Sequence, residues 1–196
     1  IEKSVSMKTR IEASSDAVIA IVVTILVLEF KSPDVPDIRL VVDHWKNFLV
    51  YIVSFFLIFT TWYDHYQLFK LSKNMTKNIF WSNAFWLFFL SIIPFTTSFA
   101  GKFPTYRGAS LLYLTNIFLW IISYIYLSYC LAQANPENAG RIKRIGFLNK
   151  QDLIIFVGGG VLSFFISWFF PAFTWIVLIF ASTFTLFFNR NGNALI

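Results

Sequence analysis

The chain has 196 residues, of which 57% are hydrophobic, 20% aromatic and only 13% charged. A soluble domain carries about 25% charged residues, and a soluble fold of this length could not bury 25 Phe, 7 Trp and 8 Tyr while covering itself with polar groups. The composition excludes a soluble enzyme, a disordered chain and a disulfide-stapled domain. The net charge of +6 is spread as small clusters between apolar blocks, which is typical of a membrane protein and not of a nucleic-acid-binding one. We therefore expect an all-α membrane protein.

Six apolar blocks are candidates for membrane-spanning helices, which need about 20 mostly apolar residues. They cover residues 13–30, 45–69, 79–100, 106–132, 153–170 and 172–188. The last two blocks are short and meet at Phe170-Pro171, where proline cannot continue a helix, so we expect a tight helical hairpin. The first block has Glu12 and Asp16 in its opening turns and no small-residue cleavage site, which argues against a cleaved signal peptide; an uncleaved signal is the alternative. We expect residues 1–196 to form one six-span domain.

Lysine and arginine are distributed unequally between the two sides that six spans would create. One side has eleven of them: Lys3, Lys8, Arg10, Lys70, Lys73, Lys77, Arg141, Lys143, Arg144, Lys150 and Arg190. The other side has five: Lys31, Arg39, Lys46, Lys102 and Arg107. Because the richer side faces the cytoplasm in most membrane proteins, we expect both termini to be cytoplasmic.

Two further segments have distinctive composition. Residues 133–150 form the only substantial polar insert, and we interpret them as a solvated cytoplasmic connector whose four basic residues suit anionic headgroups. Gly158-Gly159-Gly160, in the fifth block, predicts a close approach of two helices, with a hinge as the alternative.

Ionisable groups at membrane depth are costly and are therefore functional candidates. Those of the first two blocks are Arg10, Glu12, Asp16, Glu29, Asp64 and His65. Arg10 and Asp16 are six residues apart and lie on different helix faces, so at least one of them needs a partner on another helix or subunit if both are paired. We expect one polar network at this end of the spans, made of Arg10, Ser15, Asp16, Trp62 and His65. The alternative is that Arg10 reaches the headgroups and Asp16 caps its own helix.

One face of the first block has a pattern that suits a narrow pore. Residues spaced by three and four form this stripe: Ser14, Ala17, Ile21, Thr24 and Leu28, with Ile25 beside them. The stripe is small and polar at its start, then aliphatic and interrupted by one hydroxyl. Aliphatic rings can gate by dewetting, and hydroxyl groups can replace part of an ion's hydration shell. Ordinary helix packing is the alternative interpretation.

No catalytic constellation is present in the sequence. HExxH, CxxC, Walker and GxSxG motifs are all missing, and two histidines, His44 and His65, are too few for a multi-histidine metal site. We therefore expect neither an enzyme nor a bound cofactor. A secondary transporter of a small cation or solute is the main alternative to a channel, although such carriers place carboxylates or broken helices near the midplane, and here only Gly158-Gly159-Gly160 hints at a break. A structural membrane protein is a further alternative.

Three motifs occur in order in the first hundred residues, at positions 10–33, 62–65 and 94–95, and together they resemble the transmembrane protein 175 family of potassium channels. Residues 10–33, RIEASSDAVIAIVVTILVLEFKSP, are similar to that family's R-x-x-x-F-S-D motif, its A-I-x-x-T-x-L-x-L helix and its K-x-P exit. Trp62-Tyr-Asp-His65 resembles its W-x-x-H motif, and Pro94-Phe95 its P-F motif. Ser14 departs from the pattern, because the family has phenylalanine there, and this leaves open how tightly the start of the first span is held.

The resemblance implies a potassium-permeable cation channel made of four six-span copies in a bacterial plasma membrane, surrounded by lipid. In this family the first span lines the ion path. The constriction would then consist of Ile21, Ile25 and Leu28, with Thr24 linked to selectivity and permeant potassium passing near Ile21 and Thr24 without a fixed metal site. The residues that hold the pore helix would be Arg10, Ser15, Asp16, Trp62 and His65. The sequence lacks a TVGYG loop, so we expect modest selectivity for potassium over sodium.

Overall fold

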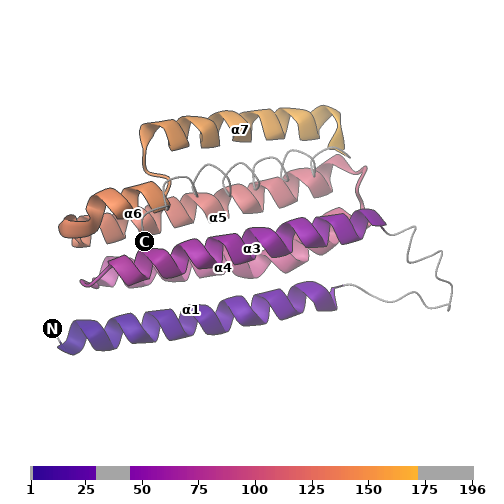
Figure 1. Ribbon diagram of the computed structural model, residues 1–196. Coiled ribbons are helices and arrows are strands. Elements are labelled where there is room, and N and C mark those ends of the chain that lie inside the picture. Colours follow the sequence, from indigo (N-terminus) through magenta and orange to yellow (C-terminus); the bar gives the residue numbers. More distant parts are fainter. Residues whose placement is uncertain (1, 30–44, 172–196) are drawn as a thin grey trace.

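A computed structural model describes residues 2–29 and 45–171 as a bundle of helices (Figure 1). The long helices are α1 (Glu2–Leu28), α3 (Trp45–Leu71), α4 (Lys77–Lys102), α5 (Arg107–Ala134) and α7 (Lys150–Phe169). In the described part of the chain, five helical segments are long and apolar enough to cross a membrane. They correspond to the first five predicted spans, whereas the sixth, 172–188, lies outside the described residues.

The helix bounds follow the sequence signals with one difference. α1 begins at Glu2 and not near residue 13, because the polar residues before the apolar block continue the same helix. α4 begins after Thr76, whose hydroxyl oxygen accepts a hydrogen bond from the Ile79 N–H at 3.3 Å. α7 ends at Phe169, directly before Phe170-Pro171, as the proline predicts. Helices suit hydrocarbon because they satisfy every backbone polar group within one segment.

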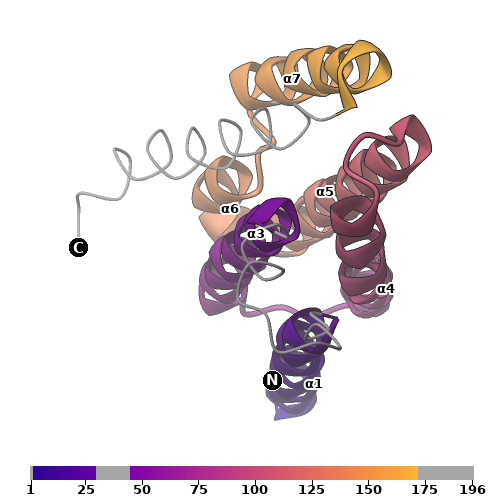
Figure 2. The ribbon, with the colours of Figure 1, turned by 90° about the vertical axis from the view of Figure 1, so that its right-hand side faces the viewer.

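α1 and α7 lie on opposite sides of the bundle, with α3, α4 and α5 between them (Figures 1 and 2). The most extensive packing is between α4 and α5. Trp86 of α4 and Trp120 of α5 are fully buried there, and their rings stack with centroids 6.2 Å apart. α1 packs against α4 and α3, while α7 packs mainly against α5. The described residues therefore have a central aromatic core, against which α1 packs from one side and α7 from the other (Figure 1).

The glycine prediction holds for one glycine of the three. A Cβ atom on Gly160 would collide with the Phe118 ring of α5, so this glycine permits the close approach of α7. Among the described residues, no atom lies within 4 Å of a Cβ placed on Gly158 or Gly159. Ser163 and Ser167 continue the small-residue contact surface of α7 and are buried.

The interpretation of residues 133–150 as a solvated connector is correct for its basic residues but not for the residues that pack against the bundle. The segment folds into a 3-10 turn, η1 (Pro136–Asn138), and a short helix, α6 (Ala139–Ile145). Asn135 and Ile142 are fully buried against the bundle, whereas Arg141, Lys143 and Arg144 are exposed. The packing could not be predicted from the polar composition of the segment. The Asn135 amide is buried at little cost in free energy because it forms hydrogen bonds.

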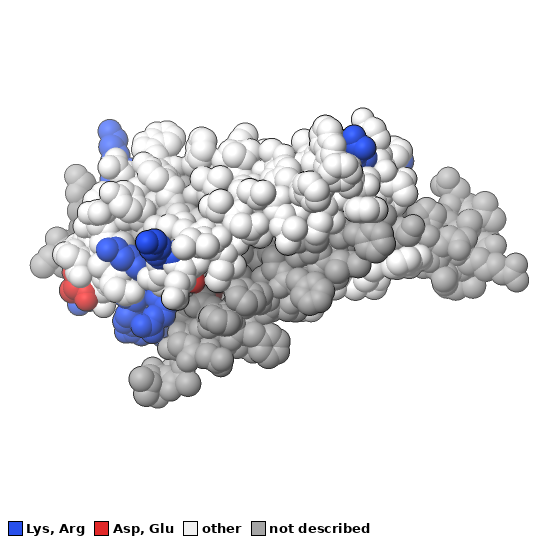
Figure 3. Space-filling view, turned by 90° about the horizontal axis from the view of Figure 1, so that it is seen from above, with Lys and Arg blue, Asp and Glu red and all other residues white. Residues whose placement is uncertain are grey.

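The bundle has two ends with the character of membrane interfaces. We call one the α6 end; α4 starts there, and α3 and α5 finish there. Exposed aromatic rings with polar edges gather toward each end, as they do at membrane surfaces. They are Tyr63, Tyr66, Trp81, Tyr126 and Tyr129 toward the α6 end, and Trp45, Tyr106 and Trp168 at the opposite end. On the face in Figure 3, basic residues likewise lie toward the two ends, and the described surface between them carries almost no charge.

Candidate functional site

The side of α1 that faces away from α3 and α4 contacts no other described helix. Ser14, Ala17 and Thr24 are exposed. The exposed fraction is 57% for Ile21, 41% for Ile25 and 74% for Leu28. Every member of the predicted stripe thus points away from α3 and α4. A contiguous apolar face of this kind needs lipid or another protein surface against it.

The opposite side of α1 is closely packed. Its buried residues recur at intervals of four, four, three and four: Ile11, Ser15, Ile19, Val22 and Leu26. All have exposed fractions of 3% or less. α1 is therefore fixed on one side to α3 and α4, and the predicted stripe is presented on another side.

The Thr24 hydroxyl has a defined orientation on the exposed face. Its Oγ1 donates a hydrogen bond to the Ile21 carbonyl at 2.7 Å. The hydroxyl proton is therefore directed into the helix, which leaves the oxygen lone pairs available as acceptors. An acceptor of this kind suits a partly dehydrated cation.

A buried polar relay links α1 to α4 and α3. The Asn83 amide nitrogen donates to Ser15 Oγ at 2.9 Å, and Ser15 Oγ donates to the Ile11 carbonyl at 2.7 Å. Asn83 Oδ1 lies 2.9 Å from His65 Nε2. Because an amide oxygen can only accept, the hydrogen in this contact is on Nε2. The imidazole ring stacks on the Trp86 ring, with ring centroids 4.6 Å apart, and this contact fixes its orientation.

Asp16 and Trp62 make a separate contact between α1 and α3. Trp62 Nε1 donates to Asp16 Oδ1 at 2.8 Å. The acceptor is a carboxylate, so this is a charge-assisted hydrogen bond. Of the five predicted network residues, the structure thus pairs Asp16 with Trp62 and joins Ser15 to His65 through Asn83. Arg10 is exposed and joins neither contact within the described residues.

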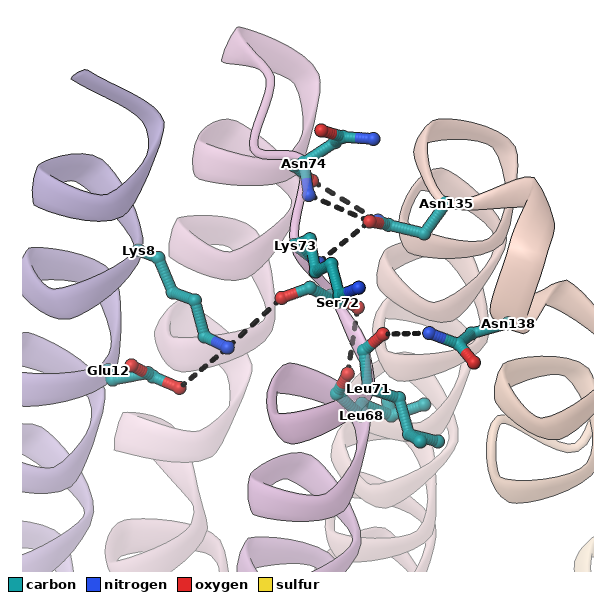
Figure 4. Close-up of polar contacts among 9 residues, drawn as sticks. All are labelled: Lys8, Glu12, Leu68, Leu71, Ser72, Lys73, Asn74, Asn135 and Asn138. Atoms are coloured by element: carbon teal, nitrogen blue, oxygen red, sulfur yellow. Dashed lines mark hydrogen bonds and ion pairs between the residues drawn. The ribbon is translucent and has the colours of Figure 1, made fainter. Parts of the chain in front are cut away.

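Lys8, and not Arg10, ties the start of α1 to the bundle. Its Nζ donates to the Ser72 carbonyl at 3.0 Å and lies 3.9 Å from Glu12 Oε1 (Figure 4). Ser72 directly follows the last residue of α3, where a cation is favoured by the helix dipole. Sequence reasoning used this lysine only to assign the cytoplasmic side, because nothing in the spacing indicated a contact with the end of α3.

Asn135 anchors the α3–α4 loop at the same end (Figure 4). Its Oδ1 accepts from the Lys73 and Asn74 backbone N–H groups at 2.8 and 2.7 Å. Its Nδ2 donates to the Asn74 and Leu131 carbonyls at 3.1 and 3.0 Å. Asn138 adds a bond from Nδ2 to the Leu71 carbonyl at 2.8 Å. Lys8 therefore holds the start of α1, and Asn135 and Asn138 hold the loop after α3, all at the α6 end.

The residue that sequence reasoning missed in the relay is Asn83. A signal was available, because it is one of few amides inside the apolar blocks, and a buried amide needs partners. Neither its partners nor its side of α4 followed from the sequence. Among the described residues, no group of three or more His, Cys, Asp or Glu is placed to hold a metal ion.

Comparisons with known proteins agree with the motif resemblance. A family model described as "Endosomal/lysosomal potassium channel TMEM175" matches residues 10–94. The chain is 32% identical over 160 residues to "Potassium channel HX13_20290" from a Chryseobacterium species, covering 81% of this chain and 83% of that protein. It is 35% identical over 121 residues to "Potassium channel Cha6605_3372" from Chamaesiphon minutus, covering 57% of this chain and 59% of that protein.

A solved structure shares the fold. It is the crystal structure of a "lysosomal potassium-selective channel TMEM175 homolog from Chamaesiphon Minutus", with a TM-score of 0.78, 24% sequence identity, and coverage of 94% of this chain and 98% of that chain. The all-α membrane fold and the resemblance of the motifs are both confirmed. The chain therefore belongs to the TMEM175 family, which is a family of ion channels and not of enzymes.

Proposed function

We propose that this chain is the subunit of a potassium-permeable channel in which four copies of α1 surround the ion path. Two relatives are named potassium channels, one of them similar over most of its length. The observation that carries the proposal is the division of α1 into a buried side and the exposed stripe around Ile21, Thr24 and Leu28. In a symmetric assembly, the exposed stripes of several copies can cover one another around a common axis.

The stripe has the chemistry of a passive, weakly selective path. Ile21, Ile25 and Leu28 form aliphatic rings that narrow the pore and can empty of water. Thr24 offers oxygen lone pairs between these rings, because its proton is used by the Ile21 carbonyl. Small and polar residues at Ser14 and Ala17 widen the mouth next to the constriction. Ions cross when the rings separate enough for water to fill the constriction. Potassium is favoured where Thr24 replaces part of the hydration shell, because potassium loses water more readily than sodium.

The polar contacts at the α6 end hold each pore helix in place. The Ser15–Asn83–His65 relay fixes the buried side of α1, and Asp16–Trp62 fixes its flank. We assign Arg10, which is exposed in the protomer, to a contact with a neighbouring copy. These residues support the pore and do not contact the ion.

The membrane placement follows from the charges. Residues 1–196 form one channel domain in a bacterial plasma membrane, with the α6 end and both termini in the cytoplasm. Ten of the eleven basic residues assigned to the cytoplasmic side are described, and all are at the α6 end: Lys3, Lys8, Arg10, Lys70, Lys73, Lys77, Arg141, Lys143, Arg144 and Lys150. This agrees with the preference of basic loops for the cytoplasm.

Single-channel recording of the full chain in planar bilayers tests the function. We expect unitary potassium currents, and Ile21→Ala to raise sodium permeability relative to potassium by severalfold because the constriction widens. Leu28→Ala should also widen the constriction and should therefore raise conductance. Val27→Ala is the matched control, since Val27 is exposed but lies about 120° around the helix from Ile21. Slow, saturable flux without unitary currents would indicate a secondary transporter instead, and normal selectivity and conductance in both stripe variants would remove Ile21 and Leu28 from the constriction.

A further inference from the structure

Three buried hydrogen-bond donors near the centre of the bundle have no acceptor among the described residues. They are the indole N–H groups of Trp86 and Trp120 and the hydroxyl group of Tyr124. None of the three side chains is more than 2% exposed. The Trp86 ring contacts both of the others, with ring centroids 6.2 Å from Trp120 and 6.1 Å from Tyr124. Buried donors in folded proteins are satisfied by protein acceptors or by bound water, so this cluster needs a partner.

One carboxyl group lies near the cluster. Asp64 is half-buried and is the only acidic residue of α3, α4 and α5. It interacts electrostatically with the Tyr124 hydroxyl group. Among the described residues, however, Asp64 forms no hydrogen bond and no ion pair. A carboxyl oxygen accepts hydrogen bonds whether or not the group carries a proton. An acceptor on α3 and a donor on α5 are therefore close to each other without bonding directly.

The helix packing and the chemistry of these groups both favour water as the missing partner. The backbone of α3 approaches α4, α1 and α6 closely, but it makes few such approaches to α5. Polar groups that face each other across a wider separation are commonly bridged by water. Water accepts from a hydroxyl or an indole and donates to a carboxyl group, whereas indole N–H groups cannot coordinate a metal ion. A buried water makes about three hydrogen bonds, and this region supplies that number.

We propose that internal water lies between α3 and α5 and bridges Asp64 to Tyr124. The bridging water accepts a hydrogen bond from the Tyr124 hydroxyl and donates one to an Asp64 carboxyl oxygen. The indole N–H groups of Trp86 and Trp120 donate to water of the same cluster. The bridge joins two helices that have little direct backbone contact, and it solvates the one acidic group of the three central helices. The site does not involve the exposed side of α1, so it can fail without affecting the proposed pore.

Water-edited solid-state NMR of the full chain in lipid bilayers tests the site, because magnetisation passes from water to the side chains that contact it. Tyr→Phe and Trp→Phe variants assign the signals. We expect water contact at the Tyr124 ring and at the Trp86 and Trp120 indoles. Tyr113 is the matched control and should be dry, because it is also fully buried on α5 but its hydroxyl lies 2.8 Å from Ser54 Oγ. A dry Tyr124 ring or two dry indoles would overturn the proposal.

Tyr124→Phe provides a second test, in which the sign of the change in stability is informative. Loss of a water-bound hydroxyl should lower the unfolding temperature by several degrees, whereas loss of a buried hydroxyl without any partner should raise it. In an Asp64→Leu background the same replacement should have much less effect, because the bridge is already lost. Tyr129→Phe, at an exposed tyrosine of α5, should have the same small effect in both backgrounds. A more stable Tyr124→Phe protein, or equal losses in the two backgrounds, would contradict a bridge to Asp64.

Discussion

Asn83 is the residue through which α1, α3 and α4 are joined, and its replacement by leucine should destabilise the fold. Leucine leaves the buried His65 Nε2–H without an acceptor and removes the amide donor from Ser15 Oγ. An unsatisfied buried donor costs about 1–3 kcal/mol. Thermal unfolding of the detergent-solubilised protein measures the loss, and a double-mutant cycle with Ser15→Ala should show coupling of about 1 kcal/mol.

The matched cycle for Asn83 uses Ser91, an exposed serine two turns farther along α4. Its hydroxyl donates to the Phe88 carbonyl and touches no part of the relay. Asn83→Leu and Ser91→Ala should therefore add without coupling. Equal coupling in the two cycles would mean that Asn83 acts through general packing and not through its hydrogen bond to Ser15.

The bond between Asp16 and Trp62 predicts a different pattern, because it lies at an exposed position between α1 and α3. Trp62→Phe removes the donor, and Asp16→Asn keeps an acceptor but loses the charge. Each should weaken the hold on α1 by about 1 kcal/mol, and we expect a lower dissociation temperature of the assembly in both variants. The double variant should be no weaker than the weaker single one, whereas Trp81→Phe, which changes an exposed indole on α4, should resemble the unmodified chain. Additive losses would show that the two residues act independently, with Asp16 serving only its own helix.

The site was predictable from the sequence as far as local spacing determines it. The three- and four-residue spacing of Ile21, Thr24 and Leu28 places them on one helix face whatever surrounds the helix. Which face is buried depends on the neighbours, and only the structure shows that the opposite face packs against α3 and α4. Partners from distant segments, such as Asn83 for His65 and Lys8 for Ser72, were beyond spacing arguments, since they depend on how the helices are rotated relative to one another.

At the scale of elements, Asn135 makes more of the described hydrogen bonds to the α3–α4 loop than any other side chain. Asn135→Ala removes four hydrogen bonds and leaves the Lys73 and Asn74 N–H groups without their acceptor. We expect hydrogen exchange of residues 72–76 to accelerate by about tenfold or more, because two backbone N–H groups lose bonds worth about 1 kcal/mol each. Hydrogen–deuterium exchange with mass spectrometry measures this directly.

Asn138→Ala provides the comparison for Asn135, since Asn138 contributes one bond to the same region, to the Leu71 carbonyl. Its effect on residues 72–76 should be much smaller. The α4–α5 core around Trp86 and Trp120 should remain protected in both variants, because neither asparagine contacts it. Unchanged exchange in Asn135→Ala would show that the loop is held by its flanking helices alone.

The bounds of the helices were predicted well in long apolar segments. They were predicted poorly in polar segments whose side chains are nevertheless buried. Long apolar blocks gave α3, α4 and α5 within two residues of their ends, since the hydrocarbon core sets both length and composition. α1 extends farther because helix formation continues past the apolar block. Residues 133–150 misled the prediction, because Asn135 uses its amide as donor and acceptor at once and is buried in spite of its polarity.

At the scale of the whole molecule, the proposed assembly places the stripe of α1 in water and its flank in protein or lipid. Cysteine scanning distinguishes these environments, after the half-buried Cys130 is replaced by alanine. Thr24→Cys and Leu28→Cys should react with a membrane-impermeant, positively charged thiol reagent, and the reaction should block potassium current. Oxidation should also link Leu28→Cys copies into covalent dimers, because symmetry brings equivalent residues of the stripe together.

Val27→Cys is the comparison for Leu28→Cys, because Val27 is also exposed, at 48% against 74% for Leu28, although it points about 100° away from Leu28 around α1. The charged reagent should leave this variant unmodified, since thiols against lipid or protein are inaccessible to it. Leu28→Cys that resists both reagent and oxidation while currents stay normal would place the stripe against lipid. The ion path would then have to run along another surface of the bundle, and α1 would serve as an outer helix.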